Sequence, residues 1–217
     1  MNYNKLSNMA GRSMIEMLGV LAIIGVLSVG GIAAFSQMLS RYKITQTYEQ
    51  INAIAAKLSA VGSEAASYDG LDNKAAIKFG AIPKEAIVDA EEGTLENLFK
   101  GEIQIIPGQF NSNVASMSYI IVYSNLPKDA CMHLATQDWG RKGSSFLNMI
   151  IMNTTKTSKI KDFQGWIKLF STGGSNSATN TAISLWLAKD MPMTPVAATK
   201  NCSQCEKKNC TLAFTFN

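Results

Sequence analysis

The chain has 217 residues, of which 47% are apolar and 17% are charged, and its formal net charge is +4. This length fits one sizeable domain together with a membrane-length segment. The net charge is small, and no cluster of Lys and Arg is interleaved with aromatic residues. The composition therefore excludes a recognisable nucleic-acid groove, and we expect no nucleic-acid partner.

The N-terminal part contains an uncharged apolar run from Met17 to Phe35. A helix needs about 20 apolar residues to cross a bilayer core, so this run predicts a membrane-length helix. One carboxylate, Glu16, stands directly before the uncharged run. A charged side chain in such a segment is costly, and this makes Glu16 a candidate functional residue.

The apolar run is predicted to be retained in the mature chain. Residues 1–10 are short and polar and are followed by Gly11. A secretory signal would place a small-residue cleavage site after the apolar run, but residues 36–43 continue with helical character. Two basic residues precede the run and two follow it closely, so the flanking charges do not set its orientation.

Beyond Phe35 the pattern becomes amphipathic, and one helix is predicted from Ser13 to Val61. Its apolar stripe recurs every three or four residues, as expected for one face of a helix. The stripe consists of Ile44, Tyr48, Ile51, Ala55 and Leu58. The polar residues between them, Gln50 included, are expected on the other side. A soluble domain must cover the stripe.

The rest of the chain alternates turn-rich segments with short elements. We predict strands at 102–106, 118–123, 146–152 and 211–216, a helix at 127–139 and a polar loop at 171–181, from β-branched content, alternation and Pro or Gly punctuation. Residues 62–101 and 171–200 are expected to form exposed, variable surface.

Gly11, Glu16 five residues later and the apolar run that follows resemble the type IV prepilin signature. The resemblance implies that a prepilin peptidase cuts between Gly11 and Arg12 on the cytoplasmic face and methylates the new amino terminus at Arg12. It also implies that Glu16 meets the amino terminus of a neighbouring subunit during assembly. Arg12 departs from the bulky apolar residue usual at that position in the family.

Four further segments are similar to those of the type IVb pilins, at 80–83, 97–105, 126–131 and 194–202. The resemblance implies an α+β fold, in which a long N-terminal helix, first hydrophobic and then amphipathic, packs on a mainly antiparallel sheet in a globular head. The expected division is a leader at 1–11, the helix at 12–62 and the head at 63–217.

The cysteines are Cys131, Cys202, Cys205 and Cys210. An even number in an exported domain indicates two disulfides, but the sequence alone leaves three pairings open. A zinc site is the competing hypothesis, because Cys202 and Cys205 have ligand spacing, and Cys210 with Cys131 or His133 would complete four ligands. The resemblance to the type IVb pilins implies Cys131 with Cys202, which leaves Cys205 with Cys210.

No catalytic constellation is evident. His133 is the single histidine, so any Ser/His/Asp or Cys/His mechanism would depend on it. Gly173 and Gly174 open no phosphate-binding motif. The three tryptophans, Trp139, Trp166 and Trp186, are expected in the core or at subunit contacts. We predict neither an enzyme nor a cofactor.

The predicted function is that of a structural subunit of a type IVb-like pilus, active in adhesion, cell contact or motility. Its expected partners are other copies of the subunit, a prepilin peptidase and the assembly platform in the inner membrane. The chain would lie in the inner membrane with a periplasmic head and then in an extracellular filament. The alternatives are a minor pilin, a type II secretion pseudopilin, or an uncleaved membrane-anchored binding module, with or without a stabilising zinc ion.

Overall fold

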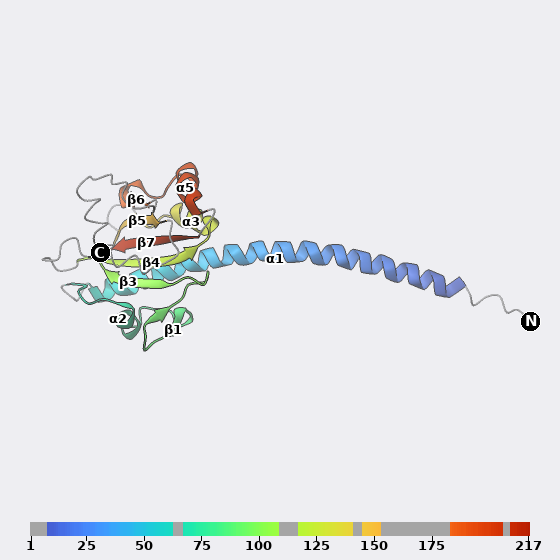
Figure 1. Cartoon of the computed structure of the whole chain (residues 1–217), viewed down its shortest axis with the longest axis horizontal. Coiled ribbons are helices and arrows are strands. Elements are labelled where there is room, and N and C mark those ends of the chain that lie inside the picture. Colours follow the sequence, from blue (N-terminus) through green and yellow to red (C-terminus); the bar gives the residue numbers. More distant parts are fainter. Residues whose placement is uncertain (1–7, 63–66, 109–116, 141–144, 153–182, 206–208) are drawn as a thin grey trace, which may run out of the picture. The chain divides into compact units, whose positions relative to one another are not determined.

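The computed structural model describes residues 8–62, 67–108, 117–140, 145–152, 183–205 and 209–217. The chain forms two compact units, one ending at Lys43 and one comprising Ile44–Asn217. The boundary lies inside the first helix, α1 (Asn8–Gly62), which is labelled in Figure 1. The expected boundary between helix and head, at residue 62, coincides instead with the end of this helix. The second unit begins earlier because its core includes helix residues from Ile44 onward.

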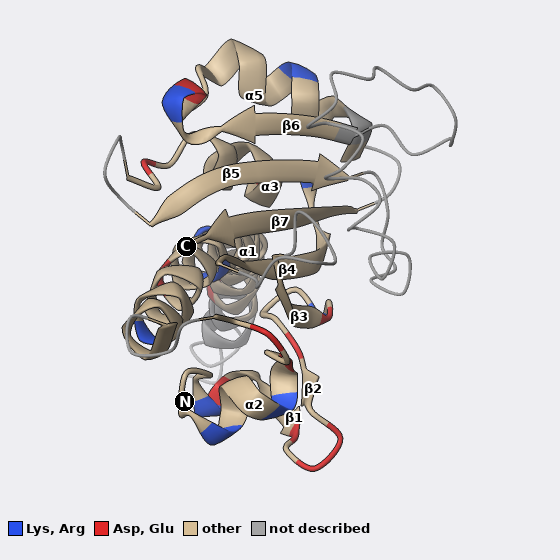
Figure 2. Cartoon of the chain, turned by 90° about the vertical axis from the view of Figure 1, so that its left-hand side faces the viewer, with Lys and Arg blue, Asp and Glu red and all other residues tan. Residues whose placement is uncertain are grey.

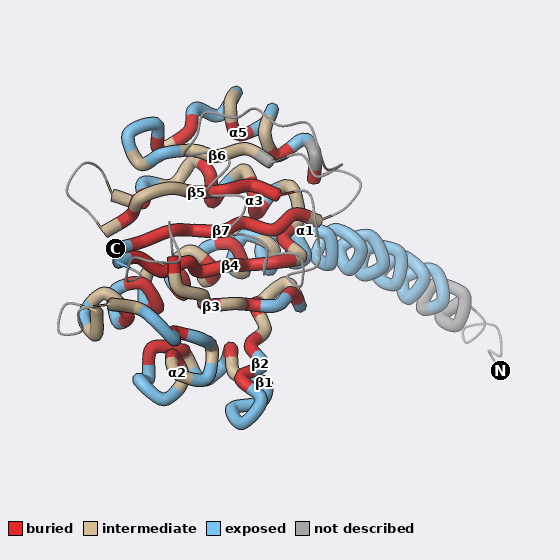
Figure 3. Tube along the Cα trace, turned by 60° about the vertical axis from the view of Figure 1, so that its left-hand side comes forward, coloured by how far each residue is buried: buried red, intermediate tan, exposed pale blue. Residues whose placement is uncertain are grey.

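The part of α1 in the first unit has no buried side chain among those described. Every side chain from Met14 to Leu39 is exposed, and Figure 3 shows this stretch in the colour of exposed residues. By length and composition, the stretch from Met14 to Gly62 is the one helix of the described chain that is long and apolar enough to span a membrane, with a mean hydropathy of 2.4 in its most apolar window.

The second unit is built on a five-stranded sheet with the strand order β3-β4-β7-β5-β6. All neighbouring strands are antiparallel. The strands are β3 (Ile103–Pro107), β4 (Tyr119–Leu126), β5 (Phe146–Met152), β6 (Ile183–Leu187) and β7 (Cys210–Phe216). The predicted α+β architecture, a long helix packed on an antiparallel sheet, is confirmed.

The predicted strands match closely in place. β5 has the predicted bounds, and β7 begins one residue earlier than predicted. β3 begins and ends one residue later, and β4 begins one residue later and continues three residues further to Leu126. The strand β6 was not predicted. The polar loop predicted at 171–181 lies outside the described residues, as does Trp166.

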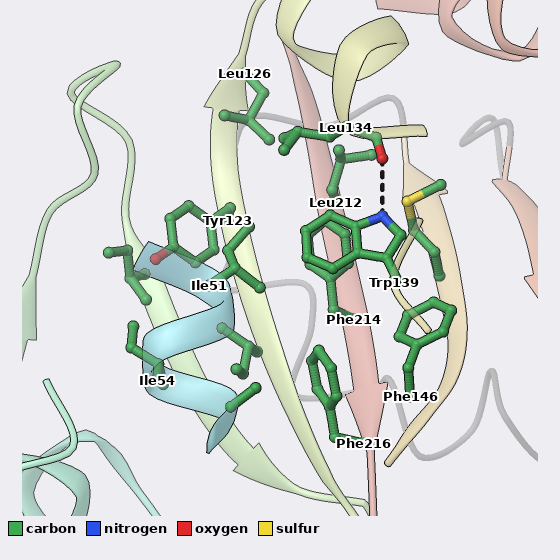
Figure 4. Packing of buried hydrophobic residues seen from close by; sticks show 14 of the residues in the cluster. Ile51, Ile54, Tyr123, Leu126, Leu134, Trp139, Phe146, Leu212, Phe214 and Phe216 are labelled. Carbon is green, nitrogen blue, oxygen red and sulfur yellow. Dashed lines mark hydrogen bonds between the residues drawn. The ribbon is translucent and has the colours of Figure 1, made fainter. Parts of the chain in front are cut away.

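The helix predicted at 127–139 is shorter in the structure. It is α3 (Lys128–Ala135), and Pro127 precedes it with extended backbone. The chain turns after Thr136, and the indole Nε1 of Trp139 donates a hydrogen bond to the backbone oxygen of Leu134 at 2.8 Å (Figure 4). Trp139 is therefore buried in the core, as expected, but from outside the helix.

Smaller elements lie at both ends of the sheet, as Figure 1 shows. Beside β3 are α2 (Asn73–Lys78), η1 (Lys84–Ala86) and the two-stranded sheet of β1 (Ile87–Asp89) and β2 (Thr94–Leu95). After β6 come η3 (Ala188–Asp190), α5 (Pro195–Cys202) and η4 (Ser203–Cys205). Thr194 caps α5 by accepting a hydrogen bond from the backbone N–H of Ala197, and Pro195 suits the first turn.

The core lies between the C-terminal part of α1 and one face of the sheet. Ile51 and Ile54 of α1 pack beside Tyr123 of β4, and an aromatic group formed by Trp139, Phe146, Phe214 and Phe216 continues the core across β7 and β5 (Figure 4). The predicted stripe is confirmed, since its aliphatic members are buried and Tyr48 is partly buried. Placing Gln50 on the solvent side was wrong, because it is buried.

The outer edge of β3 is closed by a side chain. The Asn73 amide donates to the backbone oxygens of Gly93 at 2.8 Å and Ile103 at 3.1 Å, and its oxygen accepts from the backbone N–H of Ile105 at 2.8 Å. The side chain thus substitutes for a neighbouring strand at an edge whose polar groups would otherwise be unpaired. It also joins the small sheet to the large one.

Candidate functional site

Glu16 is exposed on α1 and is the one charged residue between Met14 and Ser40. A carboxylate surrounded by apolar residues is tolerated in water, but it is costly once lipid or other apolar helices cover that helix. The apolar side chains around it require such a cover, because a soluble protein rarely leaves an apolar surface of this size exposed. We therefore expect lipid or other apolar helices to cover the surface of α1 around Glu16.

The Gly11–Arg12 bond lies in the first turns of α1, whose backbone is described from Asn8. Arg12 and Glu16 are four residues apart in this helix, and residues at that spacing lie on the same face. An amino group at residue 12 and the carboxylate of residue 16 would thus be presented along one side of the helix. The side chains of residues 8–13 lie outside the description.

The C-terminal part of α1 is fixed to the sheet by buried hydrogen bonds. The Tyr123 hydroxyl donates to Gln50 Oε1 at 2.9 Å, and the Tyr119 hydroxyl donates to the backbone oxygen of Ala55 at 2.7 Å. Both rings are fully buried, and burial raises the pKa of each hydroxyl above its ordinary value. These bonds set the position of the helix along its axis, because sliding it would leave buried polar groups unpaired.

The two tyrosines predict a loss of stability in alkali. In the unfolded chain they ionise near pH 10, whereas in the folded unit the raised pKa keeps them neutral. Their contribution is complete below pH 10, and the free energy of unfolding then falls by about 1.4 kcal/mol per pH unit for each tyrosine. Urea unfolding at pH 8 to 11 measures the slope. Tyr123→Phe should reduce the slope of the free energy of unfolding against pH by about half. An equal slope in the variant and in the unaltered protein would contradict the contribution assigned to Tyr123.

The four cysteines form two disulfides, Cys131–Cys202 and Cys205–Cys210, which are 71 and 5 residues apart in sequence. This is the pairing that the resemblance implies. Cys131–Cys202 joins α3 to the end of α5, and Cys205–Cys210 joins η4 to the start of β7. All four residues are buried. The disulfides thus attach the segment that follows β6 to the rest of the core.

The zinc hypothesis is not supported by this arrangement. A disulfide sulfur is not a thiolate, so none of the four cysteines is available as a ligand in the bonded state. Among the residues that the structure describes, no group of His, Cys, Asp or Glu is placed to hold a metal ion. His133 is exposed on α3, and its Nδ1 forms a hydrogen bond with Gln137 Nε2 at 2.9 Å.

Sequence reasoning missed two residues that fix the architecture, Gln50 and Asn73. Gln50 lies four residues before the buried Ile54 and so shares its face of the helix, but its polarity assigned it to the solvent side. Asn73 follows Asp72, whose side chain caps α2 by accepting from the backbone N–H of Ala75 at 2.7 Å. That capping signal predicts the start of a helix but not the contact with β3.

Comparison with known proteins gives three results. A family model described as PilS N terminal matches residues 41–217. Among solved structures, a type IVb pilin from Salmonella typhi is similar, with 17% identity, a TM-score of 0.44, and coverage of 78% of this chain and 98% of that chain. No curated protein matches. Because the family model covers well over half of the chain, this protein belongs to the PilS N-terminal family and is a type IV pilin, a structural subunit of a pilus.

Proposed function

We propose that this chain is made as a prepilin, cleaved between Gly11 and Arg12, methylated at Arg12 and polymerised through α1 into a type IVb-like extracellular filament. Its partners are other copies of the chain, a prepilin peptidase and an assembly platform in the inner membrane. Before assembly the apolar helix would lie in the inner membrane with the head in the periplasm.

One observation carries this proposal: the apolar stretch of α1 from Met14 to Leu39 is exposed throughout and holds a single carboxylate, and the same helix continues into a disulfide-linked head. A membrane anchor alone accounts for the exposed apolar side chains, since lipid would cover them. It does not account for Glu16, because a passive anchor gains nothing from a charge beside its apolar run. In a filament the neighbouring helices replace lipid, and the amino group released by cleavage can pair with that carboxylate.

Two disulfides are consistent with a head that folds outside the cytoplasm, where oxidising conditions allow them to persist. The same disulfides argue against the zinc-stabilised form of the anchored binding module, because they leave no cysteine thiolate as a ligand. An uncleaved anchor without zinc remains the alternative to test, because it requires the same helix.

Mass spectrometry of the intact chain from the membrane and from sheared filaments tests processing. We expect a chain that begins at Arg12 and carries one added methyl group. Gly11→Val should leave the full-length chain in the membrane, because the residue before the cut is altered. Gly19→Val is the matched control, since a side chain at Gly19 would meet no atom within 4 Å in the chain.

A filament chain that starts at Met1 would overturn the processing step. A chain absent from filaments and found with an intact N-terminus in the membrane would instead favour the uncleaved anchor. The amount of this chain in filaments distinguishes a major pilin, which is the bulk component, from a minor pilin or a pseudopilin, which is not.

A further inference from the structure

The five-stranded sheet carries no charge on either face. None of its strands contains Asp, Glu, Lys or Arg, and Figure 2 shows them in the colour of uncharged residues. An antiparallel sheet with one face in water usually alternates apolar and polar residues along each strand. A sheet of five strands without a charged residue therefore indicates cover on both faces.

The face opposite α1 has a buried apolar cluster of its own. In β4, Tyr119, Ile121 and Tyr123 belong to the core that includes α1, whereas Ile120 and Val122 belong to a second cluster. We call this the second-face cluster. Its other members are Ile150, Met152 and Ala213, and the partly buried Ile106 and Leu185 pack against them. All five strands contribute to it.

The second-face cluster is covered within a single copy of the chain. Its five buried members are at most 5% exposed. Each described residue of this cluster lies in a strand, and the buried apolar residues of α1, α2, α3 and α5 all belong to the other cluster. The described helices thus do not supply the cover, and a second copy is not needed to supply it.

The connection from β5 to β6 begins and ends beside this cluster. Met152 and Ile183 are paired across the two strands, so a hairpin loop of about 2–5 residues could join them. The chain instead places 30 residues between them, at 153–182. Connections longer than about 12–15 residues are uncommon in compact domains. Met152 itself belongs to the cluster, and Leu185 of β6 packs against it.

This connection contains an amphipathic sequence. Ile160, Phe163, Ile167 and Phe170 recur every three or four residues, Trp166 falls on the same side, and Lys, Asp and Gln lie between them. A helix of residues 160–170 would be about 16 Å long. The outermost of five strands lie about 19 Å apart, so one such helix can cross the sheet.

Other undescribed segments of the second unit offer less apolar surface. Residues 109–116 contain Phe110 and Val114. Residues 63–66, 141–144 and 206–208 contain no large apolar side chain. The connection at 153–182 is therefore the best match to a cluster that reaches across five strands.

We propose that residues 160–170 form an amphipathic helix that packs on the second-face cluster of the same copy. The sheet is then covered by α1 on one face and by this helix on the other. Trp166 takes a buried position in this second layer of the core. The inference goes beyond the proposed function, because it concerns the head alone and holds whether or not the chain is processed.

Urea unfolding of the full-length chain in detergent tests the contact. Phe163→Ala should raise the equilibrium constant for unfolding by about a hundredfold, because a large aromatic side chain is lost from a packed core. Gln164→Ala is the matched control, since the next residue lies on another side of the helix. The control should leave the equilibrium constant unchanged.

Thiol labelling reports the cover directly. Val122→Cys places a thiol on the second face, and Ile121→Cys places one on the face that α1 covers, both at fully buried positions. Both thiols should react slowly with a maleimide. Serine at 163, 166 and 167 together should raise the rate at position 122 at least tenfold and leave the rate at position 121 unchanged. Non-reducing gels check that the native disulfides have formed.

Unchanged unfolding of Phe163→Ala would overturn the proposal, and so would an unchanged labelling rate at position 122. If the triple serine variant does not fold, the two single alanine variants decide. Loss of stability from Phe110→Ala with none from Phe163→Ala would assign the cover to residues 109–116 instead. None of these measurements uses filaments, so absence of the chain from filaments would overturn the proposed function and leave this inference intact.

Discussion

Glu16→Ala should eliminate filaments while the chain still folds and enters the membrane. The substitution removes the one charge between Met14 and Ser40 and makes the helix more apolar, so insertion is not impaired. The head is unaffected because its core begins at Ile44. What is lost is the proposed pairing with the amino terminus of another copy.

The expected size of this effect follows from the environment in the filament. An amino group buried among apolar helices without its partner costs about 3–5 kcal/mol, which is a reduction of more than a hundredfold in the equilibrium for adding a subunit. Because this loss of free energy recurs each time a subunit is added, the filament does not grow. The pairing is attractive in a medium of low dielectric constant and is absent when the register is wrong, so it also selects the correct register.

Electron microscopy and immunoblots of sheared fractions measure the result. The matched control is Glu49→Ala, which removes a carboxylate from the same helix in the head, where it accepts a hydrogen bond from Gln46 at 2.8 Å. Glu49→Ala should assemble normally. Normal filaments from Glu16→Ala would show that the carboxylate has no part in assembly, and a chain missing from the membrane would show that it acts earlier.

Removal of the Cys131–Cys202 disulfide should lower the free energy of unfolding by about 4 kcal/mol, because the crosslink closes a long loop in the unfolded chain. The sequence separation is 71 residues. Typical domains have a total stability of about 5–15 kcal/mol, so this is a large fraction. The double variant Cys131→Ala and Cys202→Ala avoids leaving a free thiol.

The second disulfide provides the matched control. Cys205–Cys210 spans 5 residues, and the same loop-entropy relation gives about 2 kcal/mol for so short a loop. Urea unfolding of the full chain in detergent compares the two double alanine variants. Equal losses would show that strain or local packing, rather than loop closure, determines what each bond contributes.

The sequence alone identified the parts that depend on local chemistry. An uncharged run of membrane length, a carboxylate before it and a short polar segment that ends at Gly11 stand within 35 residues, and recognising them does not depend on distant contacts. The amphipathic stripe of α1 was also predictable, because helical spacing decides which residues share a face. β5 was predictable as an apolar run of strand length, and β7 was predictable from its alternating pattern.

Other features were decided by partners far away in the sequence. Gln50 is buried because Tyr123, 73 residues later, donates a hydrogen bond to it. Asn73 closes the edge of β3 although its local signal is that of a helix start. Trp139 enters the core because the chain turns after α3, which a helical pattern does not foresee. In each case a polar group is paired with a group that the fold brings to it.

The sheet shows the same division between sequence and structure. The sequence determined where most of its strands lie along the chain. Their order, with β3 and β6 as the outermost strands, was decided by the fold. Strand order depends on long-range pairing of backbone groups, which are the same at every residue except proline, and local sequence therefore does not specify it.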